Sequence, residues 1–243
     1  MSDRSIIYTA IAGGYDNLKP PRNDVHPGRP EVDLQEQDGS LRIAFLDNPD
    51  LCAVTRCPGW QIEPMASSCM DPLMQAKRYK VLAHEVLPPG AEFSLWVDGS
   101  IEVGVDLHPE VLALRYLKEV DLALFRHAHR NCLYDEARAC QLRRLDDSMV
   151  MARQMNRYRA EGYPRNNGLA ECCVILRRHT SAVTKLNELW WREINNGSRR
   201  DQLSFNYACW KLGLKYSLLP GIISQKGVPG NPFFRKRHHA KPR

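Results

Sequence analysis

Several features are missing from this sequence, and each absence excludes a class of protein. No apolar run approaches the roughly 20 residues that a membrane-spanning helix needs. The opening residues lack the long apolar segment of a signal peptide. The eight cysteines include no Cys-x-x-Cys pair, which argues against a structural zinc site. We therefore expect a soluble, cytoplasmic protein whose cysteines are reduced thiols.

Signatures of dinucleotide and nucleic-acid binding are also missing. Gly13-Gly14 follows an apolar segment but does not complete a Gly-x-Gly-x-x-Gly fingerprint. Basic repeats interleaved with aromatic residues are absent, so we expect no nucleic-acid partner. The net charge of +6 is uneven, because residues 235–243 hold five lysines and arginines. This basic C-terminal tail could meet a phosphate-bearing ligand or make peripheral contact with an anionic membrane surface, or it could be a solvated terminus.

The length and the order of the elements predict a single α/β domain over residues 1–243. The hydrophobic fraction of 43% is ordinary for a globular protein. Strand and helix patterns alternate without an internal repeat or a long linker. Strands are predicted at 6–12, 41–46, 52–56, 93–97, 101–103, 121–125, 169–176 and 216–219. Helices are predicted at 71–87, 108–118 and 133–161, and two more lie between 183 and 210.

Apolar stripes and caps define the predicted helices more closely. Asp71 is expected to cap the first helix, with Pro72 in its first turn, and Ser198 is expected to cap the last. Apolar residues three or four positions apart mark the buried faces of two others. These stripes are Leu145, Met149, Ala152 and Met155, and then Val183, Leu186, Trp190 and Ile194.

The segment 92–104, EFSLWVDGSIEVG, carries an informative local pattern. Strand-forming residues precede Asp98, and Gly99 and Ser100 interrupt the run before an apolar pattern resumes. An acid followed by glycine at the carboxyl end of a buried strand stands where open α/β sheets bind ligands. A carboxylate there can hold a divalent cation, and the cation can hold a diphosphate. The alternative is that Asp-Gly-Ser is only a hairpin turn between two strands.

Other polar residues lie at predicted strand ends or inside an apolar strand. Tyr15 and Asp16 follow the first strand and could contact a base and a ribose, although a plain turn is a common alternative. Glu171 lies in a nearly continuous apolar strand, where a carboxylate is costly unless it has a partner. His127 and His129 follow another strand, and we expect them to contact substrate rather than metal.

Two predicted helices carry charged residues with two interpretations each. Lys77, Arg78 and Lys80 lie largely off the apolar stripe of their helix, so they could bind phosphate or a nucleobase, or form a solvated face. Asp201 and Gln202 fall in the first turn of the last helix. The helix dipole stabilises an acid there, which gives Asp201 a structural explanation as well as a functional one.

Five segments together resemble a known family. They are YTAIAGGYD, LWVDGSIEV, HRNCLYDEA, GLAECCVILRRH and RRDQLSFNYACWKLGL. The combination resembles the TOD1/MUCI70-type glycosyltransferase-like domain, which plant mucilage and turgor-regulating proteins share with many small bacterial proteins. The resemblance implies a GT-A-like (Rossmann-like) mixed central sheet flanked by helices. It also implies transfer of a sugar from a nucleoside diphosphate, UDP by default, to a glycan or glycolipid acceptor, as in polysaccharide biosynthesis.

The resemblance further implies a metal ion and a set of donor contacts. GT-A enzymes bind Mn²⁺ or Mg²⁺ through an Asp-x-Asp motif, and here Asp98 keeps the first acid while Ser100 replaces the second. A hydroxyl or water would then complete the shell of the cation. The residues expected to bind the nucleotide sugar are Ala12, Gly13, Tyr15, Asp16, Lys77, Arg78, Trp96, Asp98, Gly99, Ser100 and Lys241.

The C-terminal half is similar to the glycogenin and lipopolysaccharide-galactosyltransferase family. Those enzymes carry an Asp-Gln pair near the transferred sugar, which Asp201-Gln202 matches. They also carry a late histidine metal ligand before a Lys-Pro pair, which His239 or His238 before Lys241 resembles with a shorter spacing. The similarity implies that a tail histidine joins Asp98 on the metal and that Lys241 binds the β-phosphate.

The catalytic candidates are therefore Asp201, Glu171 and Gln202, which would face the sugar and the acceptor. In an inverting enzyme, Asp201 or Glu171 would take the proton of the acceptor hydroxyl. A retaining enzyme requires no dedicated strong base. The sequence leaves both stereochemical outcomes open.

Two other functions are compatible with the sequence. Members of this family have also been described as alkaline ceramidases, which would be metal-dependent amide hydrolysis. The zinc ligands would then come from His127, His129, His238, His239 and Asp98. The missing second acid of the Asp-x-Asp motif would instead suit a sugar-nucleotide-binding module without catalysis.

Overall fold

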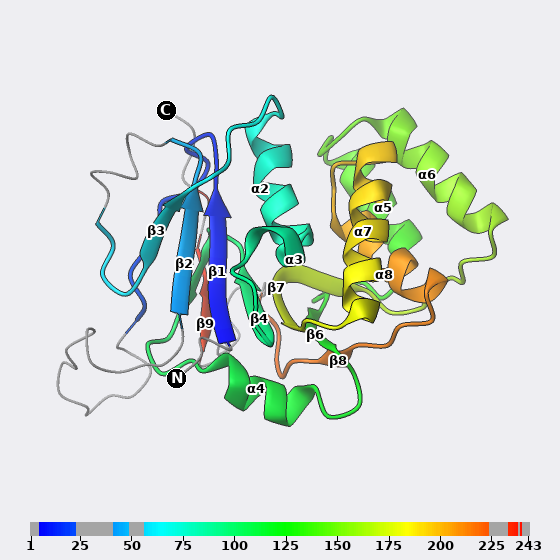
Figure 1. Cartoon of the computed structure of the whole chain (residues 1–243). Coiled ribbons are helices and arrows are strands. Elements are labelled where there is room, and N and C mark those ends of the chain that lie inside the picture. Colours follow the sequence, from blue (N-terminus) through cyan, green and yellow to red (C-terminus); the bar gives the residue numbers. More distant parts are fainter. Residues whose placement is uncertain (1–4, 23–40, 49–55, 224–232, 238, 240–243) are drawn as a thin grey trace.

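The computed structural model describes residues 5–22, 41–48, 56–223, 233–237 and 239. A seven-stranded sheet forms its centre, with strand order β3-β2-β1-β4-β7-β6-β8 (Figure 1). These strands are β1 (Ser5–Ile11), β2 (Leu41–Leu46), β3 (Gln61–Pro64), β4 (Phe93–Val97), β6 (Leu122–Arg126), β7 (Ala170–Arg178) and β8 (Ser217–Leu218). A second, two-stranded sheet pairs β5 (Ile101–Val103) with β9 (Phe234–Lys236).

Seven helices flank the central sheet in the described part of the chain. They are α2 (Pro72–Val81), α3 (Ala83–Val86), α4 (Pro109–Tyr116), α5 (Leu133–Leu142), α6 (Ser148–Ala160), α7 (Ser181–Asn196) and α8 (Gln202–Lys211). The predicted α/β class, with a mixed central sheet between helices, is confirmed. None of these helices is both long enough and apolar enough to cross a membrane.

The order of the strands creates a switch point beside β1. Strands β2 and β4 both pair with β1 in parallel, one on each side of it, so the connections leave β1 in opposite directions. Strand β7 runs antiparallel between β4 and β6. Open α/β sheets bind ligands at the carboxyl ends of the strands that border such a switch point. The carboxyl ends of β1 and β4 are therefore the expected place for a ligand.

The hydrophobic core has one layer on each face of the sheet. Ile6 and Tyr8 of β1 point to the face covered by α2, α3 and α7, whereas Ile7 points to the face covered by α4. Figure 1 shows α2, α3 and α7 together on one side of the sheet. Successive strand residues point to opposite faces, so a strand covered on both faces is apolar throughout. This explains why every residue of β1 is buried.

Helices α5, α6 and α8 enclose a third cluster that is rich in tyrosine. The rings of Tyr158 and Tyr207 stack with their centroids 3.6 Å apart, and the Tyr163 ring meets Tyr207 edge-on. The Tyr158 hydroxyl donates to Glu193 of α7, which also pairs with Arg157. The cluster therefore joins α6 to α7 and α8, and it fixes the start of α8 next to the sheet.

The helix predicted at 71–87 is correct at its beginning and wrong in its continuity. The Asp71 carboxylate accepts from the backbone N–H groups of Leu73 and Met74, and Pro72 stands in the first turn, as predicted. The helix is interrupted at Leu82, whose φ of −91° and ψ of 51° are not helical. Helices α2 and α3 therefore meet at an angle, and the last turn of α2 points toward the end of β4.

The helix predicted at 133–161 is two helices, and half of its predicted stripe is wrong. Residues 143–147 separate α5 from α6, and Asp147 caps α6. Leu145 lies in that connection and Met149 in the first turn of α6, where they are 43% and 66% exposed. The stripe residue Met155 is buried, as predicted. The buried stripe predicted on α7, from Val183 to Ile194, is confirmed.

Two other predictions near the ends of elements need correction, and a third is not tested. The strand predicted at 52–56 lies largely outside the described residues, and β3 was not predicted because QIEP has no strand pattern. Ser198 does not cap α8, because Asp201 is the residue before its first turn and the Ser198 hydroxyl donates to Asp146. The start of the basic tail is a strand, since β9 pairs with β5.

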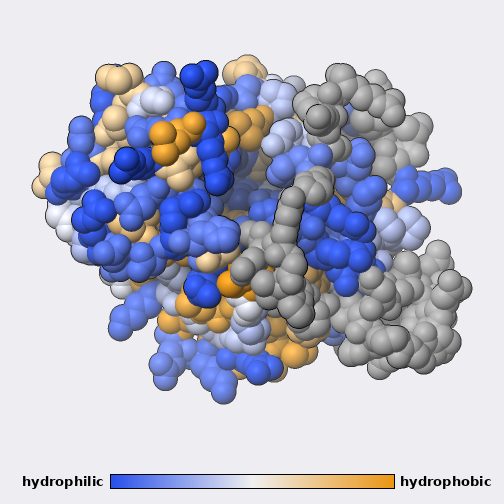
Figure 2. All heavy atoms as spheres, turned by 180° about the vertical axis from the view of Figure 1, so that it is seen from behind, coloured by the Kyte–Doolittle hydropathy of each residue, from blue (hydrophilic) through white to orange (hydrophobic). Residues whose placement is uncertain are grey.

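The surface is largely polar, and the cysteines within the described residues are unpaired. Figure 2 shows hydrophilic residues over most of the side of the molecule that is hidden in Figure 1, with hydrophobic residues between them in small areas. Seven cysteines lie in the described residues, and all seven are free. Only Cys69 among these seven is exposed.

Trp190 of α7 tests the core that positions α8. Its ring is fully buried against Phe205, and its indole N–H donates to the carbonyl oxygen of Asp201 at 2.9 Å. Trp190→Ala should lower the free energy of unfolding by about 3–5 kcal/mol, because it leaves a cavity. Trp190→Phe should lower it by about 1 kcal/mol, mainly through the lost hydrogen bond. Urea denaturation measures both, and Trp191→Ala, which removes a half-buried ring, should cost less than Trp190→Ala.

Candidate functional site

A cavity of about 240 Å³ lies at the carboxyl ends of β1 and β4, at the switch point of the sheet. We call it the strand-end cavity. The predicted site residues that line it are Tyr15, Asp16, Lys77, Trp96, Asp98, Gly99, Ser100, Glu171, Asp201, Gln202 and His239. Ala12, Gly13 and Arg78 are not part of its lining, and His238 and Lys241 lie outside the described residues.

Asp98 occupies the end of β4, and the segment that follows is not a hairpin. Strand β4 pairs with β1 and β7, whereas β5 pairs with β9, so Asp98-Gly99-Ser100 joins two different sheets. The hairpin alternative is therefore wrong. The backbone N–H of Asp98 donates to the carbonyl oxygen of Cys173, which extends the ladder between β4 and β7 to this residue. The Trp96 indole N–H donates to Asp98 Oδ1 at 2.7 Å and orients the carboxylate.

Lys80 is central to the site, whereas the sequence only grouped it with Lys77 and Arg78 as a possible phosphate-binding cluster or a solvated face. Its ammonium group lies 2.9 Å from Asp98 Oδ1 and 2.7 Å from Asp201 Oδ2. Lys77, one turn earlier in α2, lies 2.6 Å from Asp201 Oδ1. The side chains of Lys80 and Asp201 are only 6% and 10% exposed. The spacing of three residues between the lysines places both on one helix face, and this was the signal available in the sequence.

The charges of this cluster stabilise each other against burial. Burial alone would raise the pKa of Asp201, but the charges of Lys77 and Lys80 hold it well below its usual range. Burial alone would lower the pKa of Lys80, but the carboxylates of Asp201 and Asp98 raise it above its usual range. Lys80 and Asp201 are therefore ionised at neutral pH.

Buried polar groups fix the backbone that carries Lys80. Arg177 of β7 is fully buried and donates to the carbonyl oxygen of Lys80 and to the Tyr8 hydroxyl, each at 2.8 Å. The Tyr8 hydroxyl donates to the same carbonyl oxygen at 3.3 Å. These bonds satisfy a carbonyl group of the last turn of α2, which has no partner within the helix. They connect β1 and β7 to the end of α2, so side chains of the sheet fix the position of the Lys80 backbone.

The C-terminal segment closes the other side of the strand-end cavity. Lys236 of β9 lies 3.1 Å from Glu171 Oε1. Arg235 and Arg237, its neighbours, pair with buried Glu102 of β5, each at 2.8 Å. The beginning of the predicted tail is thus bound to the fold by three ion pairs rather than extended into solvent.

His239 contacts the first loop of the chain rather than Asp98. Its Nδ1 lies 3.0 Å from Asp16 Oδ1, and its ring centroid lies 4.6 Å from that of Tyr15. Asp16 itself lies against Gly99, where an added Cβ would come within 3.1 Å of Asp16 Oδ2. Glycine at position 99 therefore leaves room for the Asp16 side chain beside the segment that follows Asp98.

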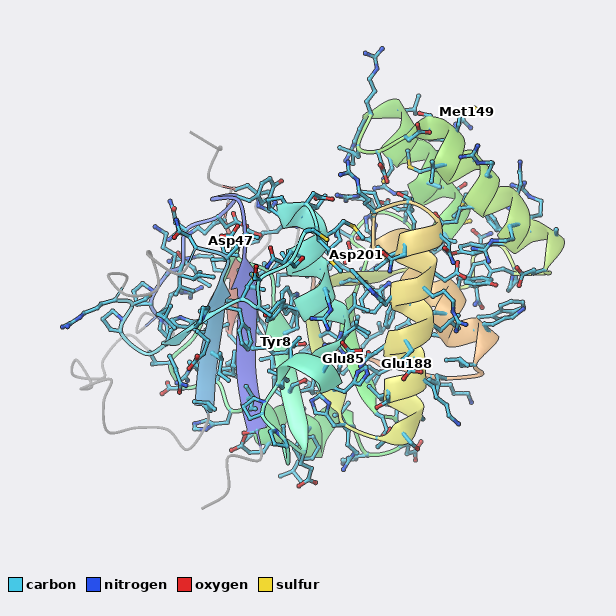
Figure 3. The ribbon with its side chains drawn as sticks, turned by 45° about the horizontal axis from the view of Figure 1, so that its top comes forward. Tyr8, Asp47, Glu85, Met149, Glu188 and Asp201 are labelled. Atoms are coloured by element: carbon cyan, nitrogen blue, oxygen red, sulfur yellow. The ribbon has the colours of Figure 1, made fainter. Side chains whose placement is uncertain are left out.

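Three buried polar atoms that belong to lining residues have no hydrogen-bond partner. They are Glu171 Oε2, Arg200 Nε and Gln202 Nε2. A buried polar atom without a partner costs about 1–3 kcal/mol. Unpaired groups in native proteins are therefore rare, and several around one cavity indicate that a polar ligand supplies the missing bonds. Figure 3 shows the position of Asp201 in this region, between α2 and α7.

The residues present can accept a divalent cation in one particular way. The described residues contain no group of three or more His, Cys, Asp and Glu side chains placed to hold a metal. Mg²⁺, however, typically binds through one or two carboxylates together with waters and substrate phosphates. Asp98 keeps one carboxylate oxygen without a hydrogen bond from the described residues, and Asp16, which lies against Gly99, lines the same cavity. This donor set fits a cation that binds together with a diphosphate.

His127 and His129, which were predicted to contact substrate, do not line the strand-end cavity. His127 lines a second cavity of about 520 Å³, beyond β7 from Asp98. The rings of the two histidines are 6.2 Å apart and lie edge to face. Among the described residues, the zinc set proposed for amide hydrolysis is therefore divided, with Asp98 and His239 in one cavity and His127 in the other.

Comparison with known proteins identifies relatives of this chain. The profile of the family described as TOD1/MUCI70, glycosyltransferase-like domain, matches residues 2–219. The probable hexosyltransferase MUCI70 of Arabidopsis thaliana is 31% identical over 228 residues, which cover 86% of this chain and 38% of the relative. The alkaline ceramidase TOD1 of the same plant is 26% identical over 164 residues, which cover 63% of this chain and 35% of the relative. The chain thus spans less than two fifths of either relative.

Among solved structures, the apo form of mouse xyloside xylosyltransferase 1 is similar to this chain. Its TM-score is 0.45 at 9% sequence identity. The superposition covers 89% of this chain and 84% of the mouse chain.

Asp201→Asn tests the buried charge cluster. The variant should be less stable than the native protein by about 3–5 kcal/mol at pH 7, because it leaves buried ammonium groups without their partner. The pKa of Asp201 is lower in the folded protein than in the unfolded chain. The stabilisation is therefore complete above about pH 4 and is lost as the pH falls below it. Urea denaturation at pH 7, 5 and 3 should show the difference between the two proteins narrowing at pH 3.

Asp135→Asn is the matched control, because Asp135 forms an exposed ion pair with Arg165. Its effect should be less than about 1 kcal/mol at each pH. A loss at Asp201 that is no larger than this, or that does not change with pH, would contradict the assignment of a buried ionised cluster.

Proposed function

The chain belongs to the TOD1/MUCI70 glycosyltransferase-like family, and on this premise we propose that it transfers a sugar from a nucleoside diphosphate, UDP by default, to a hydroxyl group of a glycan or glycolipid acceptor. The observation that carries the proposal is the set of unpartnered buried atoms around the strand-end cavity, next to the buried lysines of α2. A sugar nucleotide has the hydroxyls and phosphate oxygens that such groups bind.

The proposed donor lies across the switch point of the sheet, with its diphosphate at the end of β4. Tyr15 and Asp16, which follow β1, contact the base and the ribose. Lys77, Lys80 and Arg200 lie around the diphosphate, where their charges stabilise the leaving group as the bond to the sugar breaks. The positions of these residues in the lining of one cavity support the assignment.

The charge balance of the cavity supports a metal ion in the same proposal. Four cationic and four acidic side chains line it, apart from His239: Lys77, Lys80, Arg200 and Lys236, and Asp16, Asp98, Glu171 and Asp201. The diphosphate of a donor therefore adds negative charge that the protein does not match. Asp98 and Asp16 would hold Mn²⁺ or Mg²⁺, and the cation would neutralise this added charge.

The transferred sugar lies between the diphosphate and the acceptor, next to Gln202 and Glu171. In the reaction, the acceptor oxygen forms a bond to the anomeric carbon as the bond from that carbon to the phosphate oxygen breaks. The nucleoside diphosphate leaves with the electron pair, and the acceptor hydroxyl loses its proton. Glu171 is the better candidate for the base, because its Oε2 is unpartnered whereas both oxygens of Asp201 are paired with lysines. A retaining reaction would need no such base.

Amide hydrolysis is the second candidate, because one relative is named an alkaline ceramidase. It predicts release of a fatty acid from ceramide in the absence of any sugar nucleotide. The separation of His127 from Asp98 and His239 argues against a zinc site built from all of them. A binding module without catalysis predicts nucleotide binding without turnover. The experiments below distinguish these outcomes.

The donor site can be tested by thermal unfolding with UDP, GDP, ADP and CDP, each with and without Mn²⁺. A ligand at about 100 times its dissociation constant adds roughly 2.7 kcal/mol to the free energy of unfolding. This corresponds to an increase of Tm of about 5–10 °C for a chain of this size. We expect one nucleotide, UDP by default, to give such an increase in the presence of Mn²⁺. Asp98→Asn should abolish the part that depends on Mn²⁺, whereas Asp135→Asn should not.

The absence of a shift with any nucleotide would contradict the proposed donor site. Nucleotide binding that is equal with and without Mn²⁺ would contradict only the metal. Ceramide cleavage by the same preparation would favour the second candidate.

Glu171→Gln tests the proposed base. The variant keeps the acceptor atom for Lys236 but cannot take a proton, so kcat should fall by about 10²–10⁴ while KM for the donor stays unchanged. Initial rates of UDP release with a saturating acceptor and varied donor measure kcat and this KM. Glu188→Gln, at an exposed position of α7 (Figure 3), should match the native enzyme, and an unchanged kcat in Glu171→Gln would remove Glu171 from the role of base.

A further inference from the structure

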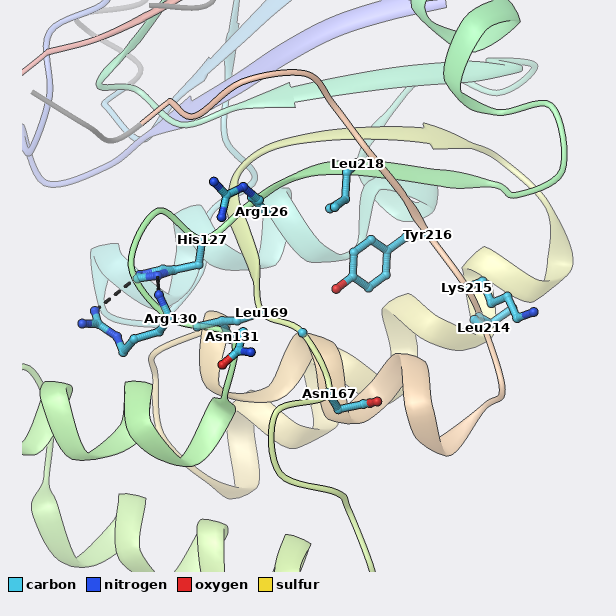
Figure 4. Close-up of a pocket in the computed structure, with 11 residues that line it drawn as sticks. Arg126, His127, Arg130, Asn131, Asn167, Leu169, Leu214, Lys215, Tyr216 and Leu218 are labelled. Carbon is cyan, nitrogen blue, oxygen red and sulfur yellow. Dashed lines mark hydrogen bonds between the residues drawn. The ribbon is translucent and has the colours of Figure 1, made fainter. Parts of the chain in front are cut away.

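The second cavity, which we call the basic cavity, lies next to the proposed donor site. Its volume is about 520 Å³, and it is bounded by the end of β6, the residues before β7 and the segment 214–218. Figure 4 shows Arg126, His127 and Arg130 on one side of it and Leu214, Lys215 and Tyr216 on the other. None of the functions proposed above for the strand-end cavity uses these residues.

The charge of this cavity is of one sign. No Asp or Glu is among its lining residues. Arg126 and Lys215 are exposed, and neither has an ion pair or a side-chain hydrogen bond within the part of the chain that the structure describes. Arg130 is already matched, because it pairs with buried Glu136 behind the cavity. Arg126 and Lys215 therefore leave two unmatched positive charges at the cavity.

His127 adds polarity to the wall without adding charge. Its Nδ1 accepts from the backbone N–H groups of His129 and Arg130, at 3.2 Å and 3.0 Å. Burial lowers its pKa, and the neighbouring charge of Arg130 acts in the same direction. The ring is therefore neutral at pH 7, and the net charge of the cavity comes from Arg126 and Lys215.

The remaining lining residues suit a sugar. Tyr216 offers a ring whose position is fixed, because its hydroxyl accepts from the Asn206 side-chain amide at 2.7 Å. Asn131 and Asn167 place two further side-chain amides at the cavity. A ring that packs against an apolar sugar face, with amides that bind hydroxyls, follows the usual design of small-ligand sites, in which a few polar groups orient the ligand on an apolar surface.

The order of the strands places the two cavities close enough for an acceptor of one or two sugar units to extend from one to the other. Strand β7 lies between β4 and β6, so the ends of β4 and β6 are two strand spacings apart, about 10 Å. Glu171 at the beginning of β7 lines the strand-end cavity, and Leu169, two residues earlier, lines the basic cavity. An acceptor that occupies the basic cavity can therefore extend a hydroxyl past Glu171 toward the donor sugar.

We propose that the basic cavity is the acceptor subsite and that it selects a saccharide carrying an anionic group, either a carboxylate or a phosphate, which Arg126 and Lys215 bind. This inference rests on the proposed function, since it names the acceptor of the same reaction. Uronic acids carry the carboxylate as the C6 group attached to the sugar ring, and phosphorylated sugars carry the phosphate as an ester of a hydroxyl. Both present the same chemistry to a guanidinium and an ammonium group.

Direct binding measured without donor tests the inference independently of transfer. Isothermal titration calorimetry would compare a hexuronate trisaccharide, the neutral hexose trisaccharide of the same linkage and a hexose phosphate. We expect at least one anionic probe to bind at least tenfold more tightly than the neutral trisaccharide, and we expect this preference to weaken as salt is added. The probe with the higher affinity identifies carboxylate or phosphate as the source of the charge.

Arg126→Glu and Lys215→Glu should each weaken binding of the preferred anionic probe at least tenfold. Arg192→Glu, at an exposed position of α7 away from both cavities, is the matched control and should leave it unchanged. All three variants should keep the native Tm and the native response to UDP, because none of these residues lines the strand-end cavity. Equal affinity for neutral and anionic probes, or affinity that the Arg126 and Lys215 variants do not change, would overturn the inference.

The two proposals can fail separately. Transfer to a neutral acceptor at the same rate as to an anionic one would leave the transferase function intact and remove the acceptor subsite. Anionic saccharide binding that depends on Arg126 and Lys215, with no nucleotide binding at all, would support the basic cavity and remove the transferase function.

Discussion

The ammonium group of Lys80, placed between the carboxylates of Asp98 and Asp201, is the interaction on which the site depends. It joins the end of α2, the end of β4 and the start of α8, which are far apart in the sequence. Removing one partner from a buried ion pair typically costs several kcal/mol, because the remaining charge has no compensation. Displacing one of the three segments would therefore leave a buried charge without its partner. Arg177 of β7 adds a further constraint, because it donates to the carbonyl oxygen of Lys80 and so fixes the backbone of this residue.

The same interaction explains why Asp201 does not act as an ordinary helix cap. It precedes the first turn of α8, where an acidic side chain would normally accept from a backbone N–H, yet it makes no such bond. Its two oxygens are instead taken by Lys77 and Lys80. Helix α8 therefore lacks the hydrogen bond from a side-chain cap, and the Asp201 carboxylate is instead held, ionised, at the cavity. Local rules that are broken in this way tend to occur at functional sites.

How far the site could be predicted depended on the range of the interactions that form it. Asp98 and Glu171 could be found from the sequence, because an acid at a strand end or inside an apolar strand is conspicuous in its local pattern. Lys80 could be named only as one of three basic residues on a helix, because its burial between two carboxylates results from the crossing of α2 over the sheet. Strand β9 was missed for the same reason, since its partner Glu102 lies more than a hundred residues earlier. The exposed Met149 shows the converse error, in which a helical period was extended through the connection between α5 and α6.

The division of charge between the two cavities follows from the sheet. Strand β7 separates them, and its first residues carry Glu171 toward the strand-end cavity while the preceding backbone borders the basic cavity. The four carboxylates of the strand-end cavity are balanced by cations, which is why we propose that a diphosphate binds there together with a metal ion. The basic cavity has no acid in its lining and keeps Arg126 and Lys215 unmatched, so it can hold an anion without a metal. Two anionic ligands bound in these cavities would lie about 10 Å apart. The Debye length at 0.1 M salt is also about 10 Å, so salt weakens the repulsion between their charges at this distance. A transferase that joins an anionic donor to an anionic acceptor needs this separation, and the width of one strand on either side of β7 provides it.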